Sequence, residues 1–229
     1  MTASGLVLAT QEPGNVTGHT TRLMLSRDDI RAVLAADVLA YGERWPVYVW
    51  TVEHPQGLVL VDTGMIEPHP AVAEWDPRCY PLDSELVARV AVVVNTHLHF
   101  DHCGGNRLFP GVPIHVQARE LADARADDGY TVREWVDFAG ATYVEHEGEA
   151  DVLPGVRLVP APGHTRGHQV VLVETREGPA VLGGDVAYSF RELGRGATDG
   201  QRRVLELGAL TWLAHESEPK VPERRVSAG

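Results

Sequence analysis

Short apolar runs alternate with amphipathic stretches along most of the chain. Residues 90–95 (VAVVVN) are almost continuously apolar, which is typical of a strand covered on both faces. Residues 47–52 and 58–61 are separated by a segment with Pro55 and Gly57, which predicts two strands joined by a tight turn. Further strands are expected over residues 114–116, 156–159, 169–173 and 180–182.

Helical patterns stand between these runs and at both ends of the chain. Residues 26–40 are expected to form a helix, with Ser26 as its N-cap and Asp28 and Asp29 at its positive N-terminal end. Residues 199–214 place valine and leucine on one face and predict a second long helix. Shorter helices are expected over residues 86–90, 117–125 and 131–138. The alternation of strands and helices predicts an α/β fold with covered sheets.

Length and composition are those of a soluble, single-domain protein. The chain has 229 residues, of which 44% are hydrophobic and 23% are charged. We expect one domain over residues 1–215 and a loose tail over residues 216–229, which carry two prolines and several charges. No apolar run approaches the roughly 20 residues of a membrane helix. The start of the chain also lacks the pattern of a secretion signal, so we expect a cytoplasmic protein with no membrane partner.

The charge balance changes the set of possible partners. Lysine and arginine number 20 against 32 aspartate and glutamate residues, which gives a formal net charge of −12. A phosphate backbone is repelled by such a balance, so a sequence-independent nucleic-acid binder is excluded. A small molecule is the expected partner, and a monomer and a homodimer are both compatible with the sequence.

The strongest chemical signal follows the expected strand over residues 90–95. There the chain reads HLHFDHCGG over residues 97–105. Residues two apart in an extended chain face the same way, so His97 and His99 can hold one ion. As the chain turns, Asp101 and His102 can face a second ion. Imidazole and carboxylate ligands suit Zn²⁺ first, with Mn²⁺, Fe²⁺ or Co²⁺ as alternatives.

Further ligand candidates lie at three later element boundaries. His164 lies in a glycine-flanked turn, Asp185 follows two glycines after the expected strand 180–182, and His215 follows the expected helix 199–214. Each residue alone is typical of a surface or capping position. Their order along the chain, together with the first motif, is what indicates a metal site.

Other side chains near these motifs have more ordinary interpretations. Cys103 adjoins His102, but a cysteine is commonly a small buried residue, so we expect an inert buried thiol and not a ligand. Cys79 has no evident role. Trp45 and Trp75 are expected in the core, with a pocket wall as the alternative.

The chain resembles the metallo-β-lactamase superfamily and, within it, the N-acyl-homoserine lactonases. The resemblance runs from about Val47 to His215 and is carried by HLHFDHCGGN (residues 97–106), PGHTRGHQ (162–169) and LVDTGM (60–65). It implies a four-layer αββα sandwich with the site at one edge, where the strands end. In that family the region between Met65 and His97 helps to form an acyl-chain channel, and its short, proline-rich form here leaves the preferred chain length open.

The resemblance also implies a role for individual residues. It assigns seven metal ligands, divided into two sets and a bridging carboxylate: His97, His99 and His164; Asp101, His102 and His215; and Asp185. Asp62 would orient a ligand histidine, and His168 would support the ligand loop. Tyr188, three residues after Asp185, would donate a hydrogen bond to the lactone carbonyl or to the oxyanion formed from it. A packing role for Tyr188 is the alternative.

The sequence therefore predicts a dinuclear-metal hydrolase. It would open the lactone ring of N-acyl homoserine lactones by attack of a metal-bridging hydroxide, with Asp101 passing a proton to the leaving oxygen. One alternative is another hydrolase of the superfamily, acting on a thioester as glyoxalase II does, or on a different small lactone or ester. The other is a non-catalytic binding or redox module that kept the metal site.

Overall fold

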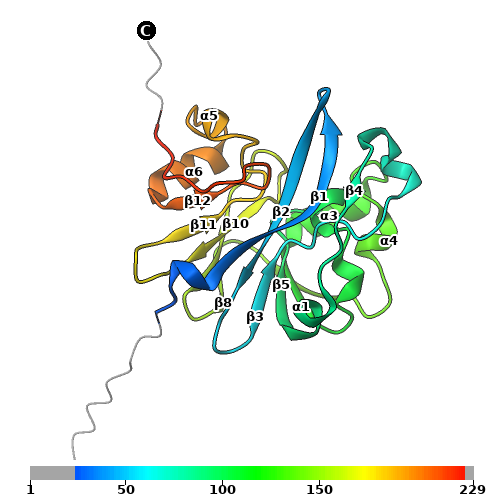
Figure 1. Cartoon of the computed structure of the whole chain (residues 1–229), viewed down its shortest axis with the longest axis horizontal. Coiled ribbons are helices and arrows are strands. Elements are labelled where there is room, and N and C mark those ends of the chain that lie inside the picture. Colours follow the sequence, from blue (N-terminus) through cyan, green and yellow to red (C-terminus); the bar gives the residue numbers. More distant parts are fainter. Residues whose placement is uncertain (1–23, 225–229) are drawn as a thin grey trace, which may run out of the picture.

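Two β-sheets packed face to face form the centre of the computed structural model, which describes residues 24–224 (Figure 1). The first sheet contains β1 (Ile30–Ala40), β2 (Glu43–Val52), β3 (Leu58–Val61), β4 (Arg78–Cys79), β5 (Val90–Val94), β6 (Pro113–Gln117) and β7 (Thr142–His146). The second contains β8 (Ala150–Leu153), β9 (Val156–Pro160), β10 (Gln169–Val173), β11 (Ala180–Leu182) and β12 (Leu210–Trp212). The strand orders are β4-β1-β2-β3-β5-β6-β7 and β12-β11-β10-β9-β8.

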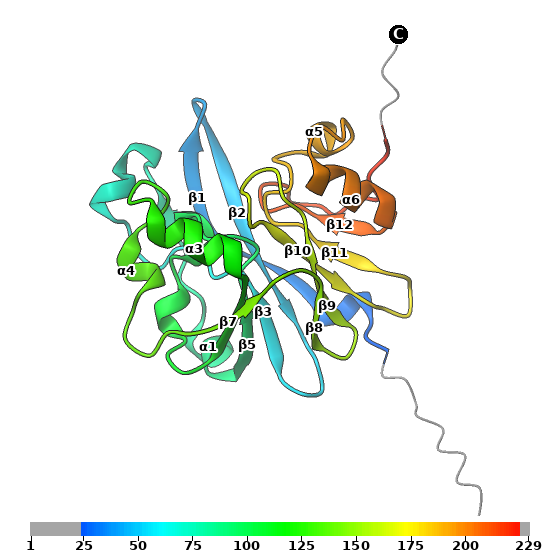
Figure 2. The ribbon, with the colours of Figure 1, turned by 180° about the vertical axis from the view of Figure 1, so that it is seen from behind.

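Helices cover the outer face of each sheet, as the view from behind also shows (Figure 2). They are α1 (Ser84–Arg89), α2 (Phe100–Cys103), α3 (Ala118–Ala126), α4 (Arg133–Val136), α5 (Phe190–Leu193) and α6 (Asp199–Leu207). Three short 3-10 helices are η1 (Arg27–Asp29), η2 (Pro70–Trp75) and η3 (Asn106–Leu108). Leu86 of α1 packs with Leu60 of the first sheet, and Val204 of α6 packs with Val170 of the second. The layers run helix, sheet, sheet, helix, so the predicted αββα sandwich is confirmed.

The core between the sheets follows from the alternation of side chains along each strand. Val171 and Val173 of β10 face the first sheet and pack with Trp50 and Val92, whereas Val170 lies on the opposite face under the helices. Burial of each such aliphatic side chain stabilises the fold by about 1.5–3 kcal/mol. This two-sided burial explains why the strands read as continuous apolar runs.

The predicted strands are found, three of them with the expected bounds. These three are β3, β10 and β11, and the other expected strands lie within, or differ by one residue from, β2, β5, β6 and β9. The short expected helices correspond to α1, α3 and α4.

The helix expected over residues 26–40 is wrong. Ser26 does cap a helical turn, because its side chain accepts a hydrogen bond from the Asp28 backbone, but that turn is only η1. The chain then runs as β1, which pairs antiparallel with β2 along nearly its whole length. Tyr41 and Gly42 link the two strands with φ values of 52° and 81°, as in the two-residue turns that favour hairpins. Pairing with β2 thus outweighs the local helical preference.

The helix expected over residues 199–214 is also wrong in its second half. It begins as expected, where the Thr198 side chain accepts a hydrogen bond from the backbone of Gln201, but it ends at Leu207. Gly208 takes a left-handed conformation with φ 58°, a common helix stop. The chain then forms β12, which pairs parallel with β11.

The first part of the expected tail is attached to β12. Thr211 and Lys220 exchange two backbone hydrogen bonds, each with an N···O distance of 2.9 Å. Residues 225–229 lie outside the described residues, and the domain boundary at residue 215 stays a prediction.

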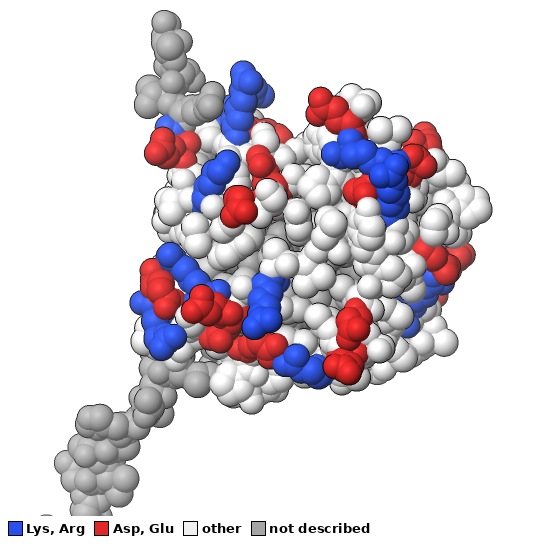
Figure 3. Space-filling model, in the orientation of Figure 1, with Lys and Arg blue, Asp and Glu red and all other residues white. Residues whose placement is uncertain are grey.

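Acidic and basic side chains are interspersed on the face drawn in Figure 3. Such side chains also form ion pairs, as between Arg203 and Glu149 with an N···O distance of 2.6 Å. Within residues 24–224, no helix is long and apolar enough to cross a membrane.

Candidate metal centre

Segments that follow strands bring the predicted ligands to one edge of the sandwich. The chain after β5, continuing into α2, carries His97, His99, Asp101 and His102; the β9–β10 loop carries His164; the segments after β11 and β12 carry Asp185 and His215. β9, β11 and β12 run in the same direction, so their carboxyl ends meet at the same edge. That edge is where open α/β sheets usually bind ligands.

The structure brings all seven predicted ligand residues together. They form three groups in which the possible ligand atoms lie within 4.8 Å of one another: His97, His99 and His164; His97, His102 and Asp185; Asp101, His102 and His215. His97 and His102 each belong to two groups. The three groups are therefore one continuous cluster.

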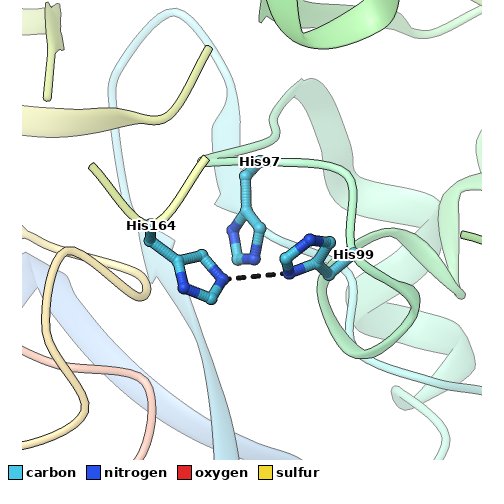
Figure 4. A group of neighbouring side chains, drawn as sticks. All are labelled: His97, His99 and His164. Atoms are coloured by element: carbon cyan, nitrogen blue, oxygen red, sulfur yellow. Dashed lines mark hydrogen bonds between the residues drawn. The ribbon is translucent and has the colours of Figure 1, made fainter. Parts of the chain in front are cut away.

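The three histidines of the first group converge from two loops (Figure 4). His164 Nε2 lies 2.9 Å from His99 Nδ1, and the His97 ring centroid lies 4.7 Å from each of the other two ring centroids. Such a concentration of imidazole nitrogens is a typical ligand set for a divalent transition metal.

Asp185 lies between the two ends of the cluster. Its Oδ1 is 3.2 Å from His102 Nε2, and its Oδ2 is 3.3 Å from His215 Nε2 and 3.6 Å from His164 Nε2. The side chain is nearly fully buried. One carboxylate is thus within reach of ligands from both outer groups.

Unsatisfied buried atoms show that the cluster fits divalent cations. Among the described residues, His97 Nε2, His102 Nε2 and Asp185 Oδ1 are buried and make no hydrogen bond of good geometry, although the last two lie 3.2 Å apart as an ion pair. Leaving such an atom unpaired costs about 1–3 kcal/mol. A cation beside them would satisfy all three. The residues present therefore suit divalent metal ions.

Asp62 holds one of these histidines in place. It is fully buried, and its carboxylate accepts hydrogen bonds from the Thr96 backbone N–H and hydroxyl, both at 2.7 Å. Its Oδ2 lies 2.8 Å from His102 Nδ1, which turns His102 Nε2 toward the cluster. Its backbone is left-handed, with φ 59°. Asp62 therefore makes the expected contact with His102, whose role as a ligand stays a prediction.

Burial and charge set the protonation of the cluster. Burial lowers the pKa of His97 well below its usual value and that of His164 to about 4, so both rings are neutral at pH 7. Burial alone would raise the pKa of Asp185, but His215 and His102 outweigh it and hold that pKa well below its usual value. Asp185 in turn outweighs burial and raises the pKa of both His102 and His215, so these two rings, unlike His97 and His164, would release a proton when a metal ion binds.

Two neighbouring residues lie outside the three groups. The Cys103 thiol donates to Leu98 O at 3.4 Å, and burial raises its pKa to about 12, so it is not a thiolate. His168 is buried with its ring centroid 5.2 Å from that of His97, and burial lowers its pKa to about 3. His168 therefore packs against the cluster as a neutral ring.

A cavity of about 340 Å³ opens onto the cluster. Its lining includes polar groups, among them His99, Asp101, Asp185 and Tyr188. It also includes apolar and aromatic side chains: Val38, Trp45, Val72, Trp75, Phe100 and Tyr130. Trp45 and Trp75, expected in the core with a pocket wall as the alternative, line the cavity, because the start of β2 and the end of η2 lie beside it.

Tyr188 lies at the cavity, with its ring against another aromatic ring and its hydroxyl beside a cluster histidine. Its ring packs edge-on against Trp45 with centroids 5.3 Å apart, and its hydroxyl lies 3.3 Å from His164 Nδ1. Burial, together with the charges of Asp185 and Asp101, raises its pKa above the usual value. The phenol therefore keeps its proton and remains a hydrogen-bond donor at neutral pH.

The backbone before Asp185 leaves no space for a side chain. Gly184 has φ +51°, and a Cβ there would lie 2.4 Å from Thr96 Oγ1, the hydroxyl that donates to Asp62. We expect Gly184→Ala to lower the free energy of unfolding by about 2–5 kcal/mol, the sum of backbone strain and overpacking. Denaturant unfolding measures this loss.

Gly42→Ala is the matched control for Gly184→Ala. Gly42 also has a positive φ of +81°, but no atom lies within 4 Å of a Cβ built there. In Gly42→Ala only the backbone strain acts, so its free energy of unfolding should fall by about 1–2 kcal/mol. Equal losses in the two variants would show that the contact with Thr96 is unimportant.

Comparisons with known proteins agree with this geometry. The sequence profile described as the metallo-beta-lactamase superfamily matches residues 42–210. An N-acyl homoserine lactonase from Bacillus sp. is 33% identical over 190 residues, covering 73% of this chain and 73% of that protein. An N-acyl homoserine lactonase from Bacillus cereus is 32% identical over 182 residues, covering 70% of each.

The fold has close relatives among solved structures. The structure of a quorum-quenching N-acyl homoserine lactone hydrolase aligns with a TM-score of 0.69 at 24% identity, covering 86% of this chain and 94% of that one. That likeness shows a common fold, and the sequence matches show common descent. The chain belongs to the metallo-β-lactamase superfamily, in the branch of the N-acyl homoserine lactonases, and is a metal-dependent hydrolase.

Proposed function

We propose that this hydrolase opens the lactone ring of N-acyl homoserine lactones at a centre of two divalent metal ions. The observation that carries the proposal is the overlap of three ligand groups through His97 and His102. A catalytic zinc ion takes about three or four protein ligands. Seven side chains are too many for one ion, whereas two sets of three with Asp185 between them suit two.

The donor set favours Zn²⁺. The first ion would be held by His97, His99 and His164, and the second by Asp101, His102 and His215. Nitrogen and carboxylate ligands without thiolate also accept Mn²⁺, Fe²⁺ or Co²⁺. When bound, such ions supply Lewis acidity, which polarises a carbonyl and makes water nucleophilic near neutral pH.

Tyr188 and Asp101 would handle the charge and the proton of the reaction. The protonated Tyr188 hydroxyl at the cavity wall can donate a hydrogen bond to the lactone carbonyl oxygen as negative charge develops on it. Asp101 also lines the cavity, with its Oδ2 3.6 Å from His102 Nε2. Its carboxylate can carry a proton to the ring oxygen that leaves when the ester bond breaks.

The polar and the apolar groups of the cavity lining suit the two ends of such a substrate. The lactone ring would face the histidines and carboxylates, and the acyl chain would lie against Trp45, Trp75 and Phe100. Trp75 belongs to η2, which forms part of the short segment between Met65 and His97. The names of the Bacillus relatives, N-acyl homoserine lactonases, support this substrate class.

A substrate panel tests the proposed class. We expect Zn²⁺-loaded protein to hydrolyse N-hexanoyl homoserine lactone with a kcat/KM at least about 100-fold above that for a glutathione thioester, because the apolar and aromatic lining suits an acyl chain and not the charged glutathione group. Initial rates of acid release under identical metal loading give the ratio. The reverse order would move the assignment to a thioesterase.

Tyr188→Phe separates the donor role from the packing role. The variant keeps the ring against Trp45 and removes only the hydroxyl, so we expect kcat to fall about 10–100-fold with little change in the melting temperature. Tyr41, a largely exposed tyrosine that also lines the cavity, provides the control, and Tyr41→Phe should keep the wild-type kcat. If Tyr188→Phe kept the wild-type kcat, the hydroxyl would have no part in the reaction and Tyr188 would serve only in packing.

A further inference from the structure

Glu120 is a charged side chain in an unusual place. It lies in the first turn of α3 and has no exposed surface. Glutamate is almost never fully buried unless it is well paired. We infer that Glu120 is a positioning residue that holds together the two loops carrying His97, His99 and His164.

One carboxylate connects the two loops directly. Its Oε1 accepts a hydrogen bond from the Leu98 backbone N–H at 2.8 Å, and Leu98 stands between His97 and His99. Its Oε2 accepts from the Thr165 hydroxyl at 2.7 Å, and Thr165 follows His164. These loops are more than sixty residues apart in the chain. Glu120 thus fixes the distance between them at the point where their histidines converge.

Tyr130 provides a third connection. Its hydroxyl donates to Glu120 Oε1 at 2.5 Å, and its ring centroid lies 5.1 Å from that of His99. Tyr130 also forms part of the cavity wall. Glu120 therefore acts on His99 through the backbone on one side and through an aromatic ring on the other.

The close approach of the β9–β10 loop to α3 shows how tightly this arrangement is packed. A Cβ on Gly167 would lie 2.3 Å from the Glu120 backbone nitrogen. The loop can reach the carboxylate only because residue 167 has no side chain. The chain thus combines a glycine, a hydroxyl and a buried carboxylate at this one contact.

The three hydrogen bonds of Glu120 involve residues next to the first ligand group and none next to His102 or His215. Their donors adjoin or contact His97, His99 and His164, and none of them adjoins His102 or His215. The inference rests on the proposal that the three histidines hold an ion. Loss of Glu120 should then weaken one of two metal positions selectively.

Cobalt binding tests this selectivity without any substrate. Co²⁺ is titrated into metal-free protein, and the visible absorption and the free metal concentration are followed for each equivalent. For Glu120→Ala we expect one equivalent to bind about 10–100-fold more weakly, with altered absorption, while the other keeps its wild-type affinity. Glu120→Gln should restore binding, because its amide oxygen can accept from Leu98 and Tyr130 while its amide nitrogen donates to the Thr165 hydroxyl.

Two further variants keep the test decisive. Val173 of β10 is buried between the sheets, so Val173→Ala is a control for a general loss of stability. It should bind both equivalents of Co²⁺ with wild-type affinity. Thr165→Val removes a single hydrogen bond and gives the same selective change if Glu120→Ala does not fold. Wild-type binding of both equivalents in folded Glu120→Ala, or in Thr165→Val, would overturn the inference. A wild-type protein that binds two Co²⁺ ions but opens no lactone would contradict the proposed function and leave this inference standing.

Discussion

Replacing Asp185 by alanine is expected to lower kcat/KM for lactone opening by about 10²–10⁴-fold and to deplete the bound metal. The two carboxylate oxygens lie within 3.6 Å of His102, His164 and His215, and the side chain is buried. Removing one member of such a buried charged group costs about 3–5 kcal/mol, which corresponds to that range of rates. Steady-state kinetics and elemental analysis of the same preparation measure both losses.

A surface carboxylate provides the control for Asp185→Ala. Asp151 pairs with Arg157 in an exposed ion pair, with an N···O distance of 2.7 Å. Exposed pairs contribute little, so Asp151→Ala should keep its metal and its rate within about 2-fold. An Asp185→Ala protein with two bound ions and the wild-type rate would exclude Asp185 from the centre.

Metal removal is expected to have the second large effect, on stability. His97, His102 and Asp185 each bury an atom with no hydrogen-bond partner, and a bound ion would satisfy these atoms only in the folded state. A ligand at 100 times its dissociation constant stabilises a fold by about 2.7 kcal/mol, so two ions should add about 5 kcal/mol. Guanidinium unfolding of the chelated and the Zn²⁺-loaded protein gives the difference between the two midpoints.

The same unfolding measurement on Asp185→Ala separates specific from general effects of metal. Most of the stabilisation by Zn²⁺ should disappear in this variant, because its two ligand sets no longer share a carboxylate. The wild-type protein could instead give the same unfolding curve whether or not it holds two Zn²⁺ ions. That result would show that the cluster does not couple metal binding to folding.

The sequence predicts the strands well where burial on two faces leaves a simple signal. Residues 58–61 and 169–173 are short apolar runs, and no helix of that length could bury them as well. The wrong helix over β1 has a different cause. Alanine and leucine favour a helix locally, and only pairing with β2 across Tyr41 and Gly42 decides for a strand.

The candidate ligands could be predicted because their spacing is tied to the chemistry. His97, His99, Asp101 and His102 lie in one short motif, and His164, Asp185 and His215 each follow a strand or an expected helix. The structure brings these seven together, and their roles as ligands stay part of the proposed function.

Glu120 could not be found in the same way. A glutamate in the first turn of a helix such as ARELADARA is ordinary and predicts an exposed side chain. Its burial depends on Leu98 and Thr165, which the fold brings to it from two other segments. Only the three-dimensional structure shows that the motif loops are connected through this residue.

Proton release is the most direct test of the central claim. Zn²⁺- or Co²⁺-reconstituted wild-type protein is mixed with N-acyl homoserine lactones of short and long chain, and the acid formed is followed in a weakly buffered solution. We predict rapid release that requires the metal and is lost in Asp185→Ala. No release from protein shown to hold two metal ions would contradict the lactonase assignment, and the metal centre would then belong to a hydrolase of another ester.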